Sequence, residues 1–399
     1  MAMPLYQAVR DCPPKLEEHS HSGLWFERFV NMYEEKNGQW EIPKPNRETE
    51  QDPKRDWINT VVSENGKARK CGDDKALQRH ALNLKQRVDF LGGETRGFQT
   101  DWHFATGLGL PHPVENGFLW HPTLGVPYLP GAAVKGLARA WVEHWDDSPD
   151  REDHLLAWFG TEHKGAVPER AGDLIFFDAL PSGPVELALD VMTPHYGKWY
   201  EQGGEIKNPA KEPEKVPADW HDPVPVPFLV VKSAALVFAI APRRKEFKDQ
   251  VEPALAALKD ALEWLGAGAK TAVGYGRMKH ASTIDGEIKA MVEAEHRRSE
   301  QKRREAEDQR RLATLSPLER EIEEIIEQRS DKNLAPYLAL IQAVEKNRWQ
   351  GEDKHRVAEK IRELMRQEKG QWKENSTKDK PEKDKEHQRT LKVLGWLKI

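Results

Sequence analysis

This sequence of 399 residues has few cysteines, no long apolar run and no excess of positive charge. Its two cysteines, Cys12 and Cys71, have no metal-type spacing and cannot make a disulfide framework. No stretch approaches the roughly 18 consecutive apolar residues of a membrane span, and the N-terminus lacks the charged and apolar segments of a signal peptide. We therefore expect a soluble, cytoplasmic protein without membrane association.

The overall charge gives no support for nucleic-acid binding. Lys and Arg number 61 against 66 Asp and Glu, so the net charge is −5 and the isoelectric point is near 6.3. Any basic surface must therefore be local. Hydrophobic residues make up 38%, enough for a core, while 32% charged residues and a mean hydropathy of −0.78 indicate much solvated surface.

A glycine-rich stretch at residues 265–278 reads LGAGAKTAVGYGRM. Its candidate binding residues are Gly268, Lys270, Thr271, Gly274, Tyr275, Gly276 and Arg277. Glycine allows positive φ and close backbone approach, so the loop can wrap a ligand. Exposed amides with Lys and Arg suit a phosphate chain, and Tyr275 offers a face for a base or a sugar. The alternative is a helix C-cap at Gly266 followed by a tight turn into a strand.

The same stretch fails the test for a nucleotide-binding P-loop. That motif needs glycine immediately before the lysine, where this chain has Ala269, and a glycine where it has Trp264. A loop that cradles a mononucleotide is therefore not expected, and we expect no cofactor.

A second basic feature is the helix predicted from Pro130 to Trp141. Lys135 and Arg139 are four residues apart and share one helix face. Together with free amides at the helix start, at Gly131, they would form an anion site. The alternative is an ordinary solvated face.

The apolar patterning predicts a strand, helix, strand, strand, helix, strand order. The segments are 97–110, 130–141, 172–180 with 185–192, 228–240, 247–265 and 275–284. This is the α+β arrangement of ferredoxin-like or RRM-like domains, here with long insertions. The predicted core is 97–284.

The flanking segments are predicted to be helical or irregular. Residues 1–96 form an N-terminal insertion of helices and loops, with a helix over 76–91 and a polar loop or poorly ordered insertion over 37–75. Residues 285–399 form a charged α-helical extension, in which Ser316 and Glu319 predict a capping box. Residues 368–390 are charged and of low complexity, which predicts disorder.

Two motifs together resemble the RAMP superfamily of CRISPR proteins. One is GVPYLPGAAVKGLAR at 125–139, and the other is the glycine-rich loop. DALP at 178–181 and DVMTPHY at 190–196 are similar, more narrowly, to the family of the sixth Cmr subunit of type III-B effector complexes. The resemblance covers about residues 17–284 and does not extend to the helical extension.

The resemblance implies a non-catalytic subunit that holds CRISPR guide RNA near its 3′ end and contributes to target RNA binding in antiviral defence. Its implied partners are other Cmr-type RAMP subunits. By position, Gly131, Lys135 and Arg139 would contact RNA phosphates, and the glycine-rich loop would line the same groove. His195 belongs to the implied RNA-binding set. Family members often carry Ser-Ser where this chain has Ala132 and Ala133, so more of the binding falls on amides and Lys135.

The main alternative is a RAMP-type endoribonuclease that processes CRISPR RNA. His195 would then act as a general acid or base near Tyr196 or Lys198. Its other interpretation is a histidine that hydrogen-bonds a loop. Asp178 and Asp190 are interpreted as strand-end residues that hydrogen-bond nearby turns. We expect no catalytic residue and no metal site.

Overall fold

The computed structural model describes residues 16–17, 20–46, 51–64, 66–161, 169–194, 196–202, 206–218, 221, 223–329, 331–376 and 380–398. The chain divides into two compact units, Met1–Glu295 and His296–Ile399. Within the described ranges, no helix combines the length and apolarity that crossing a membrane requires.

The main sheet of the first unit has the order β11-β15-β6-β16, with every neighbouring pair antiparallel. Its strands are β6 (Glu94–Thr100), β11 (Leu174–Phe176), β15 (Ala235–Pro242) and β16 (Met278–His280), and β12 (Leu180–Pro181) also pairs with β15. Helix α4 (Gly131–Trp145) follows β6, and α7 (Val251–Trp264) follows β15. This is the predicted ferredoxin-like order, so the α+β RRM-like fold class is confirmed.

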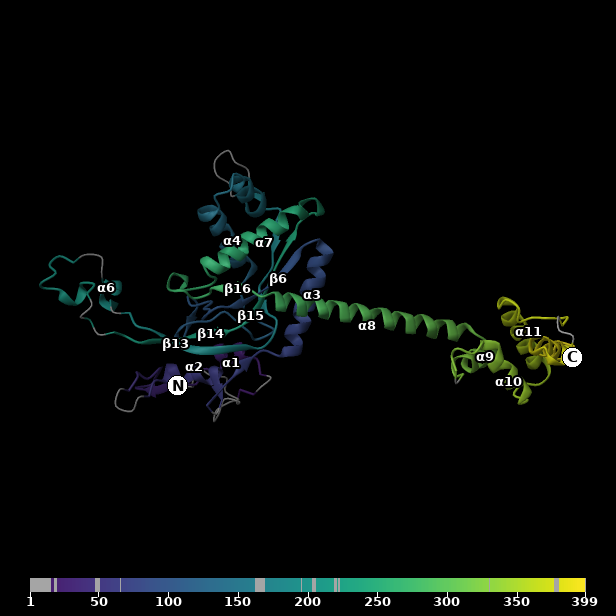
Figure 1. The fold of residues 1–399 in the computed structure, drawn as a ribbon. Coiled ribbons are helices and arrows are strands. Elements are labelled where there is room, and N and C mark those ends of the chain that lie inside the picture. Colours follow the sequence, from purple (N-terminus) through teal and green to yellow (C-terminus); the bar gives the residue numbers. More distant parts are fainter. Residues whose placement is uncertain are drawn as a thin grey trace. The chain divides into compact units, whose positions relative to one another are not determined.

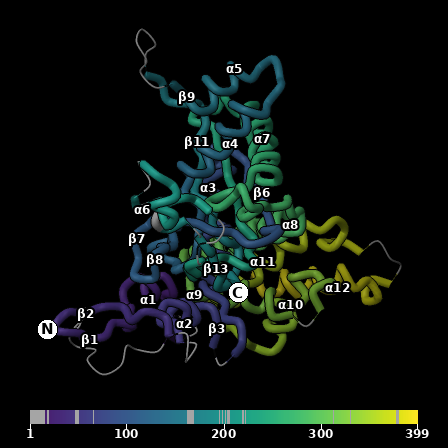
Figure 2. The backbone as a smooth tube through the Cα atoms, turned by 90° about the vertical axis from the view of Figure 1, so that its left-hand side faces the viewer, coloured from purple at the N-terminus to yellow at the C-terminus, as the bar shows by residue number. Residues whose placement is uncertain are grey.

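Alternate side chains of β15 explain how this sheet is covered on both faces. Leu236, Phe238 and Ile240 join the core that includes the buried faces of α4 and α7, which lie side by side in Figures 1 and 2. Val237 and Ala239 point the other way, into a cluster with α3 (Asp74–Leu91) and the first turns of α8 (Ser282–Thr314).

A second sheet has the order β14-β13-β5, from β14 (Val226–Ser233), β13 (Val185–Met192) and β5 (Lys70–Cys71). Helix α2 (Pro53–Val62) packs on it. The predicted single strand over 228–240 is therefore wrong. The chain changes sheets at Ala234, and both halves are equally apolar because both are buried on two faces.

Three other boundaries also differ from the prediction. The polar stretch 37–75 contains α2, whose Trp57, Ile58 and Val61 are fully packed in the core. The strand predicted over 97–110 ends at Thr100, and the chain then makes isolated bridges from Phe104 to Val231 and from Ala105 to Ala269. The last predicted strand shortens to β16, because α8 begins at Ser282 and Asp285 in its first turn accepts the Gly97 amide.

Shorter elements complete the first unit. They are α1 (Ser22–Arg28), β1 (Glu34–Lys36), β2 (Gln39–Glu41), β3 (Ser63–Glu64), β4 (Lys67–Ala68), β7 (Pro111–His112), β8 (Glu115–Asn116), α5 (Arg151–His154), the π-helical turn Leu155–Phe159, β9 (Gly160–Thr161), β10 (Arg170–Ala171), α6 (Gly197–Gln202) and the 3₁₀ turns Pro213–Lys215, Lys245–Gln250 and Thr271–Val273.

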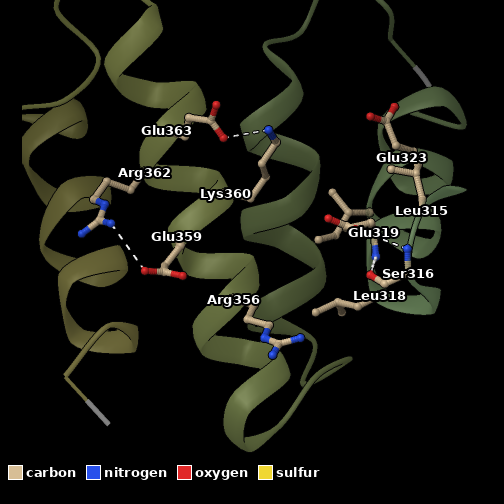
Figure 3. A pocket seen from close by; sticks show the side chains of 11 residues that line it. Leu315, Ser316, Leu318, Glu319, Glu323, Arg356, Glu359, Lys360, Arg362 and Glu363 are labelled. Atoms are coloured by element: carbon tan, nitrogen blue, oxygen red, sulfur yellow. Dashed lines mark hydrogen bonds and ion pairs between the residues drawn. The ribbon is translucent and has the colours of Figure 1, made fainter. Parts of the chain in front are cut away.

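The second unit is a bundle of α9 (Pro317–Glu327), α10 (Pro336–Glu345), α11 (Gly351–Gln367) and α12 (Lys385–Trp396). The predicted capping box is confirmed, because Ser316 and Glu319 bond each other's amides. A hollow between α9 and α11 has walls of mixed charge (Figure 3).

The disorder predicted over 368–390 is wrong for the described part of that segment. Thr390 of α12 is fully buried, and its Oγ1 accepts a 3.0 Å hydrogen bond from the Lys373 amide. His387 Nδ1 bonds the Lys373 carbonyl at 3.0 Å. Hydrogen bonds from buried polar side chains thus stabilise a segment whose composition alone predicts a disordered, solvent-exposed chain.

Candidate nucleic-acid interface

The glycines of the loop 266–277 let the protein backbone pack against itself. Gly268 has φ +84°, and a Cβ there would lie 2.1 Å from the Ala105 carbonyl oxygen. Gly276 has φ +76°, and its Cβ would lie 1.9 Å from the Ala267 carbonyl oxygen. The glycines therefore allow backbone segments of the protein itself to approach each other closely, rather than a ligand to approach the loop. This agrees with the alternative interpretation, a tight turn that leads into a strand.

The amides of the loop are also used internally. Ala269 donates to the Ala105 carbonyl at 2.8 Å, and Gly276 donates to the His103 carbonyl at 2.7 Å. Gly274 donates to the Thr271 carbonyl at 2.9 Å. The expectation of exposed amides that wrap a phosphate chain is therefore wrong for these positions.

Tyr275 is an anchor of the loop. Only 5% of its surface is exposed, and its hydroxyl donates a 2.6 Å hydrogen bond to Asp190 Oδ2 on β13. Burial, followed by the neighbouring Asp190 carboxylate, raises the pKa of Tyr275. The expectation that its ring offers an open face to a base is wrong, because the ring packs near Phe228 in the core. Lys270 lies over the same Phe228 ring, 5.5 Å from its centroid.

Part of the loop does face α4 across a groove of about 800 Å³. The described lining residues are Leu129, Ala133, Leu137, Ala140, Trp264, Leu265, Gly266, Ala267, Gly268, Thr271, Ala272, Gly274 and Arg277. Of these, Arg277 alone carries a charge. Gly268, Thr271, Gly274 and Arg277 are therefore brought together as predicted, while Lys270, Tyr275 and Gly276 are not among the lining residues.

The predicted cations of α4 lie on a different side of that helix. Lys135 and Arg139 are roughly 120–160° around the helix from Ala133 and Leu137, which line the groove. Lys135 Nζ instead donates a 2.8 Å hydrogen bond to the Phe159 carbonyl. The prediction that both cations share one groove with the glycine-rich loop is therefore wrong.

Arg243, which follows β15, joins the two α4 cations. Burial, then the nearby Arg243 and Arg139, lowers the pKa of Lys135. Arg243 Nε donates to the Gly172 carbonyl at 2.7 Å, and Arg139 has a long 3.8 Å contact with Glu143. We call Lys135, Arg139 and Arg243 the cation cluster. Sequence patterns missed Arg243 because it is distant in sequence from α4, and only the fold brings the two together.

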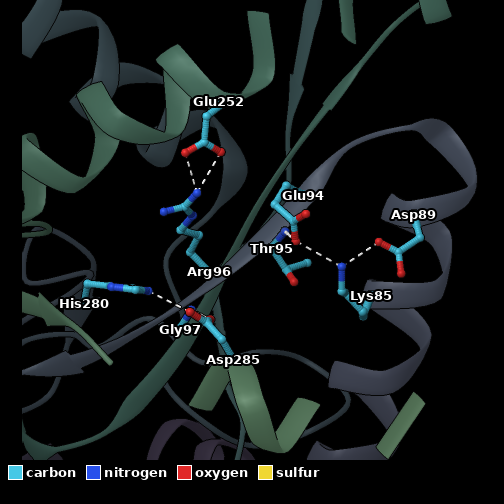
Figure 4. Close-up of polar contacts among 9 residues, drawn as sticks. All are labelled: Lys85, Asp89, Glu94, Thr95, Arg96, Gly97, Glu252, His280 and Asp285. Atoms are coloured by element: carbon cyan, nitrogen blue, oxygen red, sulfur yellow. Dashed lines mark hydrogen bonds and ion pairs between the residues drawn. The ribbon is translucent and has the colours of Figure 1, made fainter. Parts of the chain in front are cut away.

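Two members of the cation cluster lack a carboxylate partner in the described part of the chain. Among the described residues, neither Lys135 nor Arg243 has a carboxylate oxygen within 4.0 Å. In contrast, Arg96 is paired with Glu252, and Lys85 lies between Asp89 and Glu94 (Figure 4). Three neighbouring positive charges, compensated among the described residues only by the long contact between Arg139 and Glu143, favour an external anion.

The start of α4 already holds an internal anion. The Gly131 amide donates a 2.6 Å hydrogen bond to Asp178 Oδ1, and a Cβ at Gly131 would lie 2.4 Å from the Phe176 carbonyl oxygen. The predicted free amide at Gly131 is therefore occupied. Asp178 and Asp190 do accept backbone amides, but not those of nearby turns as interpreted. Asp178 bonds the start of α4, and Asp190, inside β13, accepts the neighbouring Val191 amide at 2.8 Å through Oδ1.

His195 lies outside the described residues, as does the side chain of Lys198, so its two interpretations both stay predictions. Over the ranges that the structure describes, no group of three or more His, Cys, Asp or Glu side chains is arranged to hold a metal ion.

The order of elements and the glycine-rich loop define the class of this protein. Residues 97–279 match the model of the RAMP superfamily. The chain is 29% identical to "CRISPR system Cmr subunit Cmr6" of Pyrococcus furiosus, over 48% of this chain and 69% of that protein. It is 27% identical to the "CRISPR system CMR subunit Cmr6" of Saccharolobus solfataricus, covering 38% of this chain and about half (51%) of that relative. Residues 97–279 thus form a RAMP-type domain, and the chain is similar to Cmr6 subunits, so the resemblance predicted from its motifs is confirmed.

Two solved structures are also similar to the chain. One is described as "Cryo-EM structure of the Type III-B Cmr-beta bound to cognate target RNA", with a TM-score of 0.42 and 23% identity over 57% of this chain and 71% of the other. The second is "Crystal structure of Cmr6 from Pyrococcus furiosus", with a TM-score of 0.26 and 24% identity over 47% of this chain and 98% of the other.

Proposed function

We propose that this chain is a non-catalytic, RNA-binding subunit of a type III-B CRISPR ribonucleoprotein in the cytoplasm. It holds the guide RNA near its 3′ end, contributes to target RNA binding and assembles with other Cmr-type RAMP subunits in antiviral defence. The similarity to Cmr6 proteins supports this assignment. In such machines base pairing reads the sequence, and the protein holds the backbone.

The observation that carries RNA binding is the cation cluster. The chain as a whole is acidic, with a net charge of −5, so a phosphate chain is attracted only where positive charge is locally uncompensated. Lys135 and Arg243, together with Arg139 and its long contact to Glu143, supply such a place on one side of α4. Arg277 adds a positive charge at the groove on another side of the same helix.

The direct test is equilibrium binding of labelled guide RNA at several salt concentrations. Replacing Lys135, Arg139 and Arg243 by alanine should weaken all sequences about equally and lower the salt slope by roughly two, since each single-strand phosphate contact contributes ~0.7. The control is Lys232→Ala, whose charge is already paired with Glu186 at 2.7 Å. An unchanged affinity and slope in the folded triple variant would identify the cluster as a solvated face.

The absence of catalysis is tested with the same RNA. Single-turnover incubation of the purified protein, with and without metal ions, should leave the RNA intact. Metal-independent cleavage that His195→Ala abolishes would instead support the alternative, a RAMP-type endoribonuclease that processes CRISPR RNA.

A further inference from the structure

Trp102 presents an ordered aromatic ring at the surface of the first unit. The residue follows β6 and is 49% exposed. Its indole lies parallel to the His103 imidazole, with centroids 4.9 Å apart and planes within 9°. The Tyr275 ring lies 4.9 Å away in a tilted arrangement. One face of the indole is thus covered by His103, while half of the residue's surface is open to solvent.

The two rings next to Trp102, those of His103 and Tyr275, are held by hydrogen bonds to one carboxylate oxygen of Asp190. His103 Nδ1 bonds Asp190 Oδ2 at 3.1 Å, and the Tyr275 hydroxyl donates to the same oxygen at 2.6 Å. Burial by itself raises the pKa of Asp190, but the hydrogen bonds from Tyr275, the Val191 amide and His103 outweigh it and leave the pKa below its ordinary value. Asp190 therefore stays ionised and holds both partners at neutral pH.

The backbone on both sides of Trp102 is fixed as well. The Asp101 amide donates to the Arg277 carbonyl at 2.9 Å, and the His103 carbonyl accepts from the Gly276 amide at 2.7 Å. The glycine-rich loop thus positions Trp102 before any ligand arrives. A preformed surface loses little conformational entropy on binding.

The chemistry around the ring favours a nucleobase over an apolar protein surface. Asp101, next to Trp102 in the chain, is exposed and paired with Lys279 at 2.6 Å. Arg277, whose carbonyl accepts the Asp101 amide at 2.9 Å, is also exposed and supplies a positive charge on the adjoining backbone segment. An exposed aromatic face on a surface that also carries a cation is the combination that binds single-stranded nucleic acid, since every base has a π-face and every nucleotide carries a phosphate. An apolar partner would require a contiguous apolar patch, and here the ring is bordered by charges.

We propose that Trp102 is a stacking platform for an unpaired nucleobase of RNA and that His103, Asp190 and Tyr275 position it. This inference rests on the proposed RNA-binding function and adds to it a base contact distinct from the phosphate contacts of the cation cluster. It also assigns the glycine-rich loop a supporting role, because its Tyr275 and Gly276 hold the platform rather than the RNA.

The test compares Trp102→Ala and Trp102→Phe with the wild-type protein in the binding of single-stranded guide RNA. Base stacking on an aromatic residue contributes about 1–3 kcal/mol by alanine substitution, so Trp102→Ala should weaken binding roughly 5- to 150-fold. Trp102→Phe should retain most of the affinity. Since no phosphate contact is lost, the salt slope of Trp102→Ala should match that of the wild type. The matched control is Trp145→Ala, a 61% exposed tryptophan at the end of α4, which should bind normally.

A fluorescent base analogue gives a second readout that a purely structural role would not produce. RNA substituted with 2-aminopurine should be quenched by the wild type and by Trp102→Phe at one position, and that quenching should disappear in Trp102→Ala. Circular dichroism confirms that the variants are folded.

The outcomes separate this inference from the proposed function. Unchanged RNA affinity in Trp102→Ala, together with weakened binding in the cation-cluster variant, would overturn the platform and leave RNA binding intact. Unchanged affinity with impaired assembly into the complex would assign Trp102 to a protein partner and also overturn it. A wild-type protein that binds no RNA would overturn the proposed function itself.

Discussion

The Gly97 amide, in the central strand β6, donates a 2.6 Å hydrogen bond to Asp285 Oδ1 in the first turn of α8. His280 Nε2 bonds the other oxygen of this carboxylate, also at 2.6 Å (Figure 4). A side chain at Gly97 would lie 2.5 Å from Ile284, so helix and strand are in direct contact. The start of α8 is therefore an integral part of the sheet core.

This contact predicts where the chain can be shortened. A protein ending at Glu295 should keep its stability and its RNA affinity within about twofold, because the mixed charges of the C-terminal unit attract no phosphate chain. A protein ending at Ala281 should be less stable by several kcal/mol, since it loses buried Ile284 and Ile288 at about 1.5–3 kcal/mol each. Urea unfolding and RNA titration of both proteins check this. Lost RNA binding in a folded protein that ends at Glu295 would place the C-terminal unit in the RNA site.

The glycine-rich loop should tolerate alanine at one glycine and not at another. Gly276→Ala places a Cβ 1.9 Å from a carbonyl oxygen at positive φ, and we expect it to destabilise the fold by about 3 kcal/mol or more. Gly274 has φ +96° but nothing within 4 Å of the added Cβ, so Gly274→Ala should cost only about 1 kcal/mol. Thermal unfolding of the two variants measures the difference, and equal losses would contradict the close packing of the Gly276 backbone against Ala267.

The contribution of Asp190 to the free energy of unfolding should depend on pH. Its folded-state pKa lies below the ordinary value of 3.8, so its stabilising effect is fully present above that pH and is lost as pH falls through the folded-state pKa. At pH 7, Asp190→Asn should lower the free energy of unfolding by about 1.5–3 kcal/mol. The difference between the two proteins should shrink as the pH falls below 3.8. Urea unfolding at a series of pH values checks this, and a difference independent of pH would rule out the charged hydrogen bonds.

The C-terminal unit should unfold as a structure with its own core. Ile361 of α11 is fully buried in that core, and Ile361→Ala should cost about 2–5 kcal/mol. The control is Leu391→Ala on α12, which is 45% exposed and should change stability little. Calorimetry of the full chain should show the transition of this unit shifted by Ile361→Ala and that of the first unit unchanged. Equal shifts of both transitions would contradict independent cores.

The sequence was sufficient for the order of the core elements because their apolar periodicity is strong. The spacing of Val134, Leu137, Ala138 and Trp141 predicts α4; Val134 and Ala138 are buried, and Leu137 and Trp141 are partly buried. The change of sheets at Ala234 is marked in the sequence only by the polar pair Lys232 and Ser233, which are exposed at the end of β14. The apolar residues on either side have no periodicity that separates two strands from one, because both halves are buried on two faces. Helix α2 was missed because its short apolar face, at Trp57, Ile58 and Val61, lies in a polar stretch rich in proline.

The candidate site was harder to predict because side-chain direction depends on tertiary contacts. The spacing of Lys135 and Arg139 correctly places them on one helix face, but nothing in that spacing shows that the glycine-rich loop faces another side of α4. Trp102 and Arg243 belong to no motif. Trp102 is identified as a candidate only by its contact with Tyr275, and Arg243 only by its position near Lys135 of α4, and both partners are distant in sequence.

Because a single residue, Ala234, joins β14 to β15, the direction of side chains in one sheet determines their direction in the other. Ala234 exchanges 3.0 Å hydrogen bonds with Thr100 through its amide and its carbonyl, and no loop separates β14 from β15. Side chains along a strand alternate with a period of two. One inserted residue here would therefore turn Leu236 and Phe238 from one face of the sheet to the other, unless β14 slipped by one residue as well. Because of this crossing, neither sheet can change register alone.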